Sequence, residues 1–233
     1  MQIVENSTFG VRAVIYRFSH RDSRLEFELY PMIHIGEQRY FDDIRHRANR
    51  CDAILYEGVA STRVRILVIS YKLIAMRKRL GLVCQSNALP RSAIDSKMVH
   101  ADISAPDFSR FWARVPRWQR LLFYMAAPVV GILGYLTASR ESLARRCEAE
   151  SLPSRDEILA RTGGLTAPYH ALRTHRDEHL VACVLKCHND FSIAQRRIGI
   201  MYGAAHMSAV IHFLRDELGY GLKSAEWVTV FSL

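Results

Sequence analysis

The chain has 233 residues, of which 49% are hydrophobic and 24% charged, so it is long enough and apolar enough to bury a core of its own. It has no low-complexity tract and no repeat of fixed period, which excludes a largely disordered chain and a repeat protein. The formal net charge of +9 predicts attraction to polyanions and acidic lipids. No zinc-finger spacing, aromatic RNA-binding motif or basic helix followed by heptads is present, which argues against nucleic-acid binding.

Cysteine usage and the first residues predict a cytoplasmic protein. The five cysteines form an odd set without C-x-x-C spacing, which argues against a disulfide framework and favours free thiols in a reducing compartment. The opening residues MQIVENS lack the basic segment and apolar run of a secretory signal. We therefore expect a cytoplasmic location.

The first part of the chain predicts a hairpin followed by a parallel crossover. Residues 11–16 and 25–35 read as strands on either side of a polar loop. From residue 38 to 50, apolar side chains recur at helical spacing, with acids early and arginines late, as the helix dipole prefers. A short strand over 53–56 follows at once. Strand, helix and strand in this order form a parallel unit, which brings the ends of both strands to one edge of the sheet.

The later segments continue this alternation. Residues 63–79 form a helical pattern that ends at Gly81. The remaining predicted elements are short strands over 82–84 and 98–101, a helix over 173–188, a strand over 198–202, a helix over 208–218 stopped by Gly219, and a strand over 227–231. We expect an α/β fold with a mainly parallel sheet, flanking helices and a helical insertion in the middle of the chain.

The middle segment differs from the rest. Arginine-rich stretches flank an uncharged run over residues 121–138, which is just long enough for a short membrane span. Pro128 predicts a broken helix there, and three placements stay open: packed on the sheet, lying on a membrane surface, or spanning a bilayer. The chain thus divides into an N-terminal half-domain (1–107), this insertion (108–165) and the C-terminal half of the same domain (166–233).

Three polar side chains follow predicted strands. His34, Glu57 and His206 close the apolar runs FELYPMIH, AILYE and IGIMYGAAH. Ligands of open α/β sheets collect at the carboxyl ends of the strands, so we expect these side chains to surround one cleft. A histidine at a strand end is also commonly a hydrogen-bonded structural residue, and that interpretation stays open for each histidine taken alone.

Two blocks of sequence resemble the TraB/PrgY/GumN family, in which a G-x-x-H strand precedes a helix and a strand ending in glutamate. The first block is YPMIHIGE, a helix and CDAILYEG; the second is GAAH, a helix, Gly219-Tyr220 and a final strand. The helix that contains Arg173, Arg176, Asp177 and Glu178 is similar in position to the family's arginine-bearing helix. Pro31 stands where the family has the first glycine, a departure that puts close backbone approach there in doubt.

The resemblance covers residues from about 25 to 89 and 172 to 233 and leaves the middle uncovered. It implies membership of a superfamily that includes Tiki-type metal-dependent proteases, erythromycin-esterase-like proteins and the haem-binding lipoprotein ChaN. It implies a fold more strongly than a reaction, because sites on one fold diverge.

The candidate site has the residue types of a metal-dependent hydrolase. His34, Glu57 and His206 are suitable ligands for Zn²⁺, Mn²⁺ or a related divalent metal ion, whose bound water becomes a nucleophile. Glu37 is the candidate proton acceptor, and Arg176 is the candidate stabiliser of a developing oxyanion. The structural alternatives are an internal ion pair between Glu57 and Arg176, and a Glu37 that only caps the following helix.

We therefore expect a TraB-like, metal-dependent hydrolase of a peptide or of a small ester or amide. Two alternatives stay open: a non-catalytic protein that sequesters a peptide, haem or another small-molecule ligand, and a basic adaptor at an anionic membrane surface. The absence of G-x-S-x-G, H-E-x-x-H and G-x-x-x-x-G-K-[ST] motifs argues against serine hydrolases, zincins and nucleotide hydrolases. The sequence does not indicate an oligomeric state.

A second set of metal-ligand residue types lies on one predicted helix. Its members follow one another at four-residue spacing: His175, His179, Cys183 and Cys187. Neighbouring members are in reach of one soft metal ion, but buried cysteines commonly serve as small hydrophobes, and we favour that second interpretation.

Overall fold

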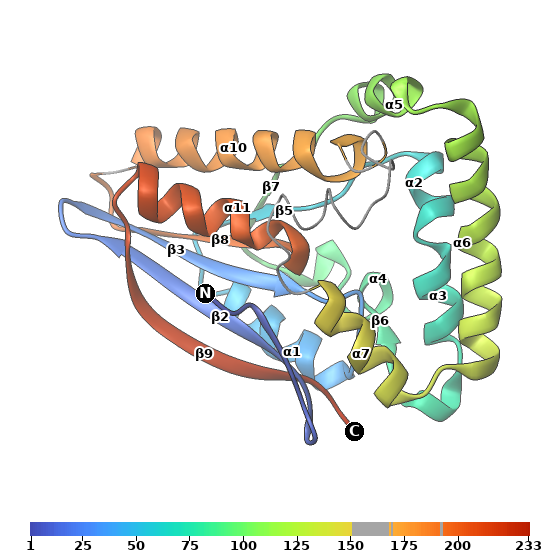
Figure 1. The fold of residues 1–233 in the computed structure, drawn as a ribbon. Coiled ribbons are helices and arrows are strands. Elements are labelled where there is room, and N and C mark those ends of the chain that lie inside the picture. Colours follow the sequence, from blue (N-terminus) through green and yellow to red (C-terminus); the bar gives the residue numbers. More distant parts are fainter. Residues whose placement is uncertain (151–167, 169, 192) are drawn as a thin grey trace.

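The computed structural model describes residues 1–150, 168, 170–191 and 193–233, and has one central sheet with helices on both faces (Figure 1). Four neighbouring strands of this sheet run parallel. In their order across the sheet they are β3 (Ser23–Met32), β8 (Arg196–Gly203), β5 (Ala53–Tyr56) and β7 (Lys97–His100). The expected α/β class with a mainly parallel central sheet is confirmed.

An antiparallel portion extends the sheet beyond β3. Its strands are β1 (Val4–Ser7), β2 (Gly10–His20) and β9 (Gly221–Ser232). The predicted hairpin is present, since β2 pairs with β3 and places Phe18 opposite Phe27. The last strand is longer than the predicted residues 227–231, because it pairs with β2 along nearly all of its length.

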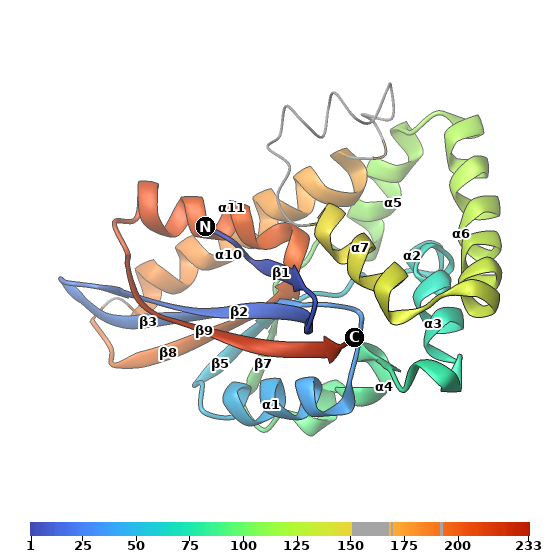
Figure 2. The same ribbon diagram turned by 60° about the horizontal axis from the view of Figure 1, so that its bottom comes forward.

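Helices cover the two faces of the sheet, with α1 on one face and α10 and α11 on the other (Figure 2). Their bounds are α1 (Gln38–Ala48), α10 (His175–Phe191), preceded by a π-helical turn (His170–Thr174), and α11 (Met207–His212), prolonged by a second π-helical turn (Phe213–Glu217). Gly219 adopts a φ of +71°, a left-handed conformation that ends the last helix where the sequence predicted.

The parallel register brings four strand ends to one edge. Met32 lies opposite Gly203, and Tyr56 lies opposite both Met201 and His100. The residues that follow these strands therefore emerge together at the carboxyl edge of the sheet, as parallel strands require.

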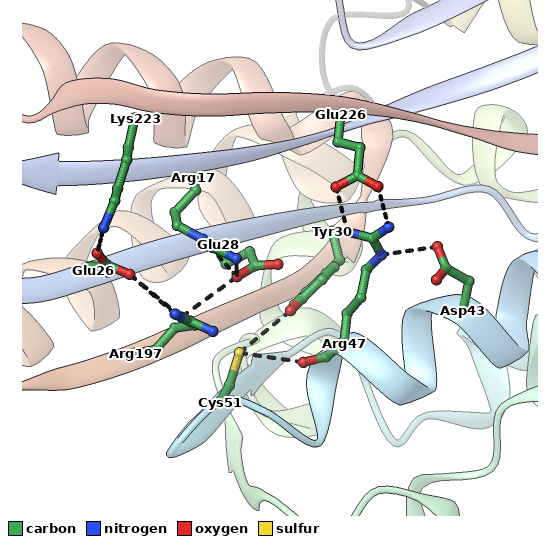
Figure 3. A network of polar contacts seen from close by, with 10 residues as sticks. All are labelled: Arg17, Glu26, Glu28, Tyr30, Asp43, Arg47, Cys51, Arg197, Lys223 and Glu226. Atoms are coloured by element: carbon green, nitrogen blue, oxygen red, sulfur yellow. Dashed lines mark hydrogen bonds and ion pairs between the residues drawn. The ribbon is translucent and has the colours of Figure 1, made fainter.

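A separate network of ion pairs lies beside α1, near the amino-terminal end of β8, and its side chains come from β2, β3, β8 and β9 (Figure 3). Glu28 is buried and pairs with Arg17 at 3.0 Å and with Arg197 at 3.7 Å. Glu26 pairs with Arg197 at 3.4 Å and also with Lys223. Each of these two carboxylates has two basic partners. We call these five residues the amino-edge cluster.

The segment after β5 is more broken than predicted. The helix expected over 63–79 divides into α2 (Thr62–Leu67) and α3 (Ile69–Ala75), because Val68 between them has a ψ of 3° and does not continue an α-helix. Four short elements follow: a 3-10 turn (Lys78–Leu80), β6 (Val83–Cys84), α4 (Gln85–Ala88) and a 3-10 turn (Arg91–Ala93). Strand β6 pairs outside the main sheet with β4 (Ile35–Gly36).

The middle segment is helical. Its described helices are α5 (Ala105–Arg114), α6 (Arg117–Thr137) and α7 (Arg140–Glu150); residues 151–165 of the predicted insertion lie outside the described residues. The prediction that the helix breaks near Pro128 is wrong, because α6 continues through this residue. A proline removes one backbone hydrogen bond, and the close packing of α6 on α3 at Gly131 and Gly134 supports the helix beyond that point.

Candidate functional site

A cavity of about 370 Å³ lies at the carboxyl edge of the sheet, between the strand ends and helices α3, α6 and α7. Four of the five residues predicted for the site line it, namely His34, Glu57, Arg176 and His206. Apolar side chains from the surrounding elements form much of its wall, among them Ile33, Tyr71, Ile74, Val130, Leu143 and Phe231. The cavity therefore combines a polar floor at the strand ends with a largely apolar wall, to which α7 adds the basic residue Arg146.

Glu57 is held by two fixed donors. Its Oε2 accepts the backbone N–H of Gly203 at 2.6 Å, and its Oε1 accepts Nη2 of Arg176 at 2.5 Å. Burial alone would raise the pKa of Glu57, but the charges of Arg176 and the two histidines outweigh it and lower the pKa to about 2. Glu57 is therefore a permanent carboxylate and a weak base.

Asp102, which follows the strand predicted over residues 98–101, belongs to this site but was not among the predicted site residues. It follows β7 and accepts Nε of Arg176 at 3.0 Å and Nη2 at 2.7 Å. It also accepts the backbone N–H groups of Gly58 at 2.9 Å and Ile103 at 2.8 Å. The sequence did offer a reason to predict Asp102 as a site residue, because it follows a strand that ends at the same edge of the sheet as the strand before Glu57. Arg176 thus lies between two carboxylates. Its ion pair with Glu57, one of the structural alternatives that the sequence left open, is present.

His206 forms a second pair with a carboxylate. Its Nδ1 lies 2.5 Å from Oδ1 of Asp177, which is on α10 one residue beyond Arg176. Nδ1–H donates to this carboxylate, so Nε2 is the nitrogen left to accept a proton or a hydrogen bond. The imidazole also packs edge-on against Tyr202, with ring centroids 5.0 Å apart. The sequence analysis named Asp177 only as a residue of the helix that resembles the family's arginine-bearing helix, and did not predict it as a site residue.

Arg173 holds the same stretch of chain in place. It lies 3.6 Å from Asp177 and donates to the backbone carbonyl of Ala205. We call Glu57, Asp102, Arg176, Asp177 and His206 the carboxyl-edge cluster.

His34 reaches the cavity from the other side. It lies two residues beyond β3, and its Nδ1 is 2.9 Å from Oε1 of Gln85. The backbone is held as well, since the N–H of Gln85 donates to the carbonyl of His34 at 2.9 Å. Tyr71 of α3 packs against the ring, with centroids 5.0 Å apart. Its Nδ1 is engaged, as in His206, which leaves Nε2 to act on a ligand.

Glu37, the predicted proton acceptor, lies outside the cavity lining. It occupies the N-cap position of α1, where its side chain makes no capping hydrogen bond. Its carboxylate pairs with Arg140 at 2.8 Å and Arg39 at 2.5 Å and accepts the N–H of Ser232 at 3.2 Å. Burial raises the pKa of Glu37, but these donors outweigh it and lower the pKa. Glu37 joins α1 to α7 and β9.

The predicted metal ligands do not fit a three-ligand centre. Among the described residues, no three His, Cys, Asp or Glu side chains gather in a geometry that holds a metal ion. Both oxygens of Glu57 already accept hydrogen bonds, one of them from a guanidinium that would repel a cation. His34 and His206 each have one ring nitrogen, Nε2, left to bind a metal ion. Two imidazoles alone are fewer than the three or four protein ligands of a usual zinc site.

The second set of metal-ligand residue types, His175, His179, Cys183 and Cys187, lies on α10, and three of its members contact neighbouring side chains. His175 stacks on Phe111 with centroids 3.8 Å apart and lies 3.2 Å from Glu178. Cys183 and Cys187 pack against the hydrophobic core, and burial raises the pKa of both thiols. These contacts favour the interpretation of the cysteines as small hydrophobes.

The resemblance to the TraB/PrgY/GumN family rests on the two blocks around His34 and His206. Comparison with models of known protein families, with curated proteins and with solved structures finds no match to this chain, so the resemblance stays a prediction.

Proposed function

We propose that the cavity binds a small ester or amide, a peptide included, and hydrolyses it with His206 as the general base. The contact of 2.5 Å between Nδ1 of His206 and Asp177, at the wall of a cavity, carries this proposal. A carboxylate that accepts Nδ1–H fixes the tautomer with a basic Nε2 and stabilises the imidazolium that forms when a proton is taken up.

In this mechanism Nε2 of His206 removes a proton from a water molecule. The water oxygen forms a bond to the carbonyl carbon of the substrate, and the π electron pair moves to the carbonyl oxygen. When the tetrahedral intermediate collapses, the bond to the leaving group breaks and the imidazolium returns its proton to the departing alcohol or amine. Asp177 keeps its negative charge throughout.

Arg176 supplies positive charge beside the reacting carbonyl, although Glu57 and Asp102 balance much of it. Its Nη1 has only a 3.4 Å contact with the carbonyl of Leu172, so this nitrogen has the capacity to donate to a developing oxyanion. Glu57 acts as a positioning residue, since it binds both Arg176 and the backbone of Gly203, three residues before His206. No step is assigned to a metal ion, because the donor set around Glu57 does not fit one.

Hydrolysis of a panel of small esters, amides and peptides by the purified chain tests the proposal. His206→Asn is expected to lower turnover by roughly 10²–10⁴-fold, the usual contribution of a general base. Lys223→Gln, a change in the amino-edge cluster, is the matched control and is expected to leave turnover unchanged. Absence of turnover by the wild-type chain, or unchanged turnover in His206→Asn, would contradict the proposal.

A chelator distinguishes this mechanism from the metal-dependent one that the sequence predicted. Activity that survives chelation supports His206 as a base acting on free water. Activity that chelation abolishes and Zn²⁺ or Mn²⁺ restores would favour a metal-bound nucleophile instead.

A non-catalytic binding protein is the second candidate. The cavity volume of about 370 Å³ lies in the range of small-molecule sites, and the carboxylate that lines it, Glu57, is already paired with Arg176. A ligand that binds in titration calorimetry and dissociates unchanged, without turnover of any substrate in the panel, would favour this candidate.

A further inference from the structure

Helix α6 has an apolar face that the described part of the chain leaves uncovered. Six large side chains at alternating four- and three-residue spacing are exposed by 51% to 64%: Trp118, Leu122, Met125, Val129, Ile132 and Leu136. This is also the one helix among the described residues that is long and apolar enough to cross a membrane, by length and composition only. A face of this kind on a soluble domain marks an interaction surface.

The opposite face of α6 is fixed to the domain. A Cβ added at Gly131 would lie 2.9 Å from Cα of Ser70, and one added at Gly134 would lie 2.5 Å from Cγ1 of Ile74. Glycines at both positions therefore allow α3 and α6 to approach closely. Ser70, Ile74 and Val130 also line the cavity, so α6 is part of its outer wall. Insertion of α6 across a bilayer would remove that wall, which favours a helix that lies on a surface.

The borders of the exposed face are also uncharged. Leu121, Leu133 and Tyr135 are exposed beside the six side chains, and no charged residue occurs between positions 121 and 138. A water-soluble pair of helices usually carries charged side chains at these flanking positions. A lipid surface requires none, because acyl chains contact the whole breadth of the face.

Basic side chains lie at both ends of the helix. At the first end the exposed ones are Arg110, Arg114 and Arg117. At the second end, Nη1 of Arg77 donates to the carbonyl of Tyr135 at 2.8 Å and so places the exposed Lys78 and Arg79 nearby. The acidic residues in these two regions are Asp107, which pairs with Arg110 at 3.5 Å, and Glu141. The basic residues outnumber them, which suits anionic headgroups.

We infer that α6 docks the protein on the surface of an anionic lipid bilayer, with its exposed face among the headgroups and upper acyl chains. Trp118 and Tyr135, near the two ends, have the amphipathic rings that favour the membrane–water interface. The inference is independent of the reaction proposed for the cavity.

Flotation of the full chain with lipid vesicles tests the inference. The wild type is expected to float with vesicles that contain phosphatidylglycerol and to bind phosphatidylcholine vesicles weakly. Met125→Asp/Ile132→Asp is expected to weaken binding by roughly a hundredfold, because two apolar side chains no longer enter the lipid. Phe9→Asp/Leu222→Asp, which changes two exposed apolar residues away from α6, is the matched control and should bind as the wild type does.

Two further measurements make the outcome decisive. Arg117→Gln/Lys78→Gln is expected to weaken binding to phosphatidylglycerol vesicles by roughly tenfold, since each basic side chain contributes to headgroup attraction. Tryptophan emission of the wild type is expected to shift to shorter wavelength on binding, and Trp118→Phe should abolish this shift. Circular dichroism confirms that each variant is folded.

Three results would overturn the inference. The first is absence of wild-type binding to either vesicle. The second is binding by Met125→Asp/Ile132→Asp, or binding to phosphatidylcholine, that equals wild-type binding to phosphatidylglycerol vesicles. The third is a dimer in sedimentation velocity that Met125→Asp/Ile132→Asp dissociates while vesicles fail to bind, which would assign the face to a second copy of the chain.

Discussion

The two edges of the parallel sheet both hold buried carboxylates paired with arginine, yet they differ in how the charges are shared. In the amino-edge cluster, Glu26 and Glu28 each have two basic partners. In the carboxyl-edge cluster, Arg176 alone serves both Glu57 and Asp102. Loss of one cation therefore leaves each amino-edge carboxylate with a basic partner, whereas loss of Arg176 removes the ion-pair partner of both the partly buried Glu57 and the fully buried Asp102.

The second difference is chemical. The carboxyl edge has the imidazoles of His34 and His206 and a cavity with an apolar wall, whereas the amino-edge cluster contains arginine, lysine and glutamate side chains only. Imidazole is the side chain that exchanges protons near neutral pH. Ion pairs alone thus do not mark a candidate site; the carboxyl edge is the candidate because its ion pairs coincide with strand ends, histidines and a cavity with an apolar wall.

The largest expected effect is a difference in the free energy of unfolding between an arginine variant at the carboxyl edge and one at the amino edge. Arg176→Met should destabilise the protein by about 3–5 kcal/mol, because it removes the guanidinium that pairs with the fully buried Asp102 and the partly buried Glu57. Arg197→Met should cost about 1 kcal/mol, because Arg17 and Lys223 remain beside the two glutamates. Urea denaturation of both variants measures the difference. Equal losses would mean that the amino edge depends on Arg197 as strongly as the carboxyl edge depends on Arg176.

The pH dependence of stability should also distinguish Glu57 from a carboxylate in an exposed ion pair. The pKa of Glu57 is about 2 in the folded chain against 4.5 as its ordinary value, so its contribution is complete above pH 4.5 and is lost as the pH falls toward 2. A depression of this size corresponds to at most about 3 kcal/mol. Glu57→Gln should therefore flatten the stability curve between these pH values.

Glu226→Gln is the control for this measurement. The hydrogen bond from Arg47 lowers the pKa of Glu226, but the carboxylate is 60% exposed, so solvent screens the pair and the curve should change less. Thermal unfolding at a series of pH values checks both variants. A wild-type curve with the same acid slope as Glu57→Gln would remove the special role assigned to Glu57.

The sheet and the positions of its strand ends were predictable because they follow from local pattern and parallel register. The run at 53–56 and the helix before it predict a parallel unit without knowledge of any contact. The division of the 63–79 helix at Val68 and the continuity of α6 through Pro128 were not predictable, since tertiary packing on α6 and α3 decides both. Propensity is a weak guide where packing competes with it.

The site residues that follow strands could be predicted from the sequence, whereas those on or next to helices were harder to predict. His34, Glu57 and His206 follow strands, and the register brings them to one cavity. Asp177 and the position of Glu37 depend on how α10 and α1 rotate about their axes against the sheet, which sequence spacing does not determine. Glu37 lies three residues from His34, but the first turn of α1 directs it toward Arg140.

A smaller effect tests how tightly the carboxyl edge is packed. A Cβ at Gly203 would lie 3.0 Å from Oε2 of Glu57 and 3.5 Å from Cδ2 of His206. Gly203→Ala should therefore cost about 1–3 kcal/mol and lower any turnover, because Glu57 has to shift from the backbone N–H that it accepts. Gly221→Ala, where the nearest atom is the carbonyl of Ser19 at 3.9 Å, is the control. Equal stability of the two variants would indicate a loose carboxyl edge.

The smallest expected difference concerns two buried tyrosines. The hydroxyl of Tyr40 donates to the carbonyl of Pro31 at 2.7 Å, in the stretch of β3 that leads to His34. Tyr40→Phe should cost about 1–2 kcal/mol, because that carbonyl loses the hydroxyl donor. Tyr30→Phe should cost less, about 1 kcal/mol, since the hydroxyl contacts the weak acceptor Sγ of Cys51 at 3.4 Å and the carboxylate of Glu28, which keeps Arg17 and Arg197 as partners. Urea denaturation of both variants measures the order. Both changes remove the same atom from equally buried rings. A reversed order would therefore show that the hydroxyl of Tyr30, beside the amino-edge cluster, contributes more to stability than the hydroxyl of Tyr40.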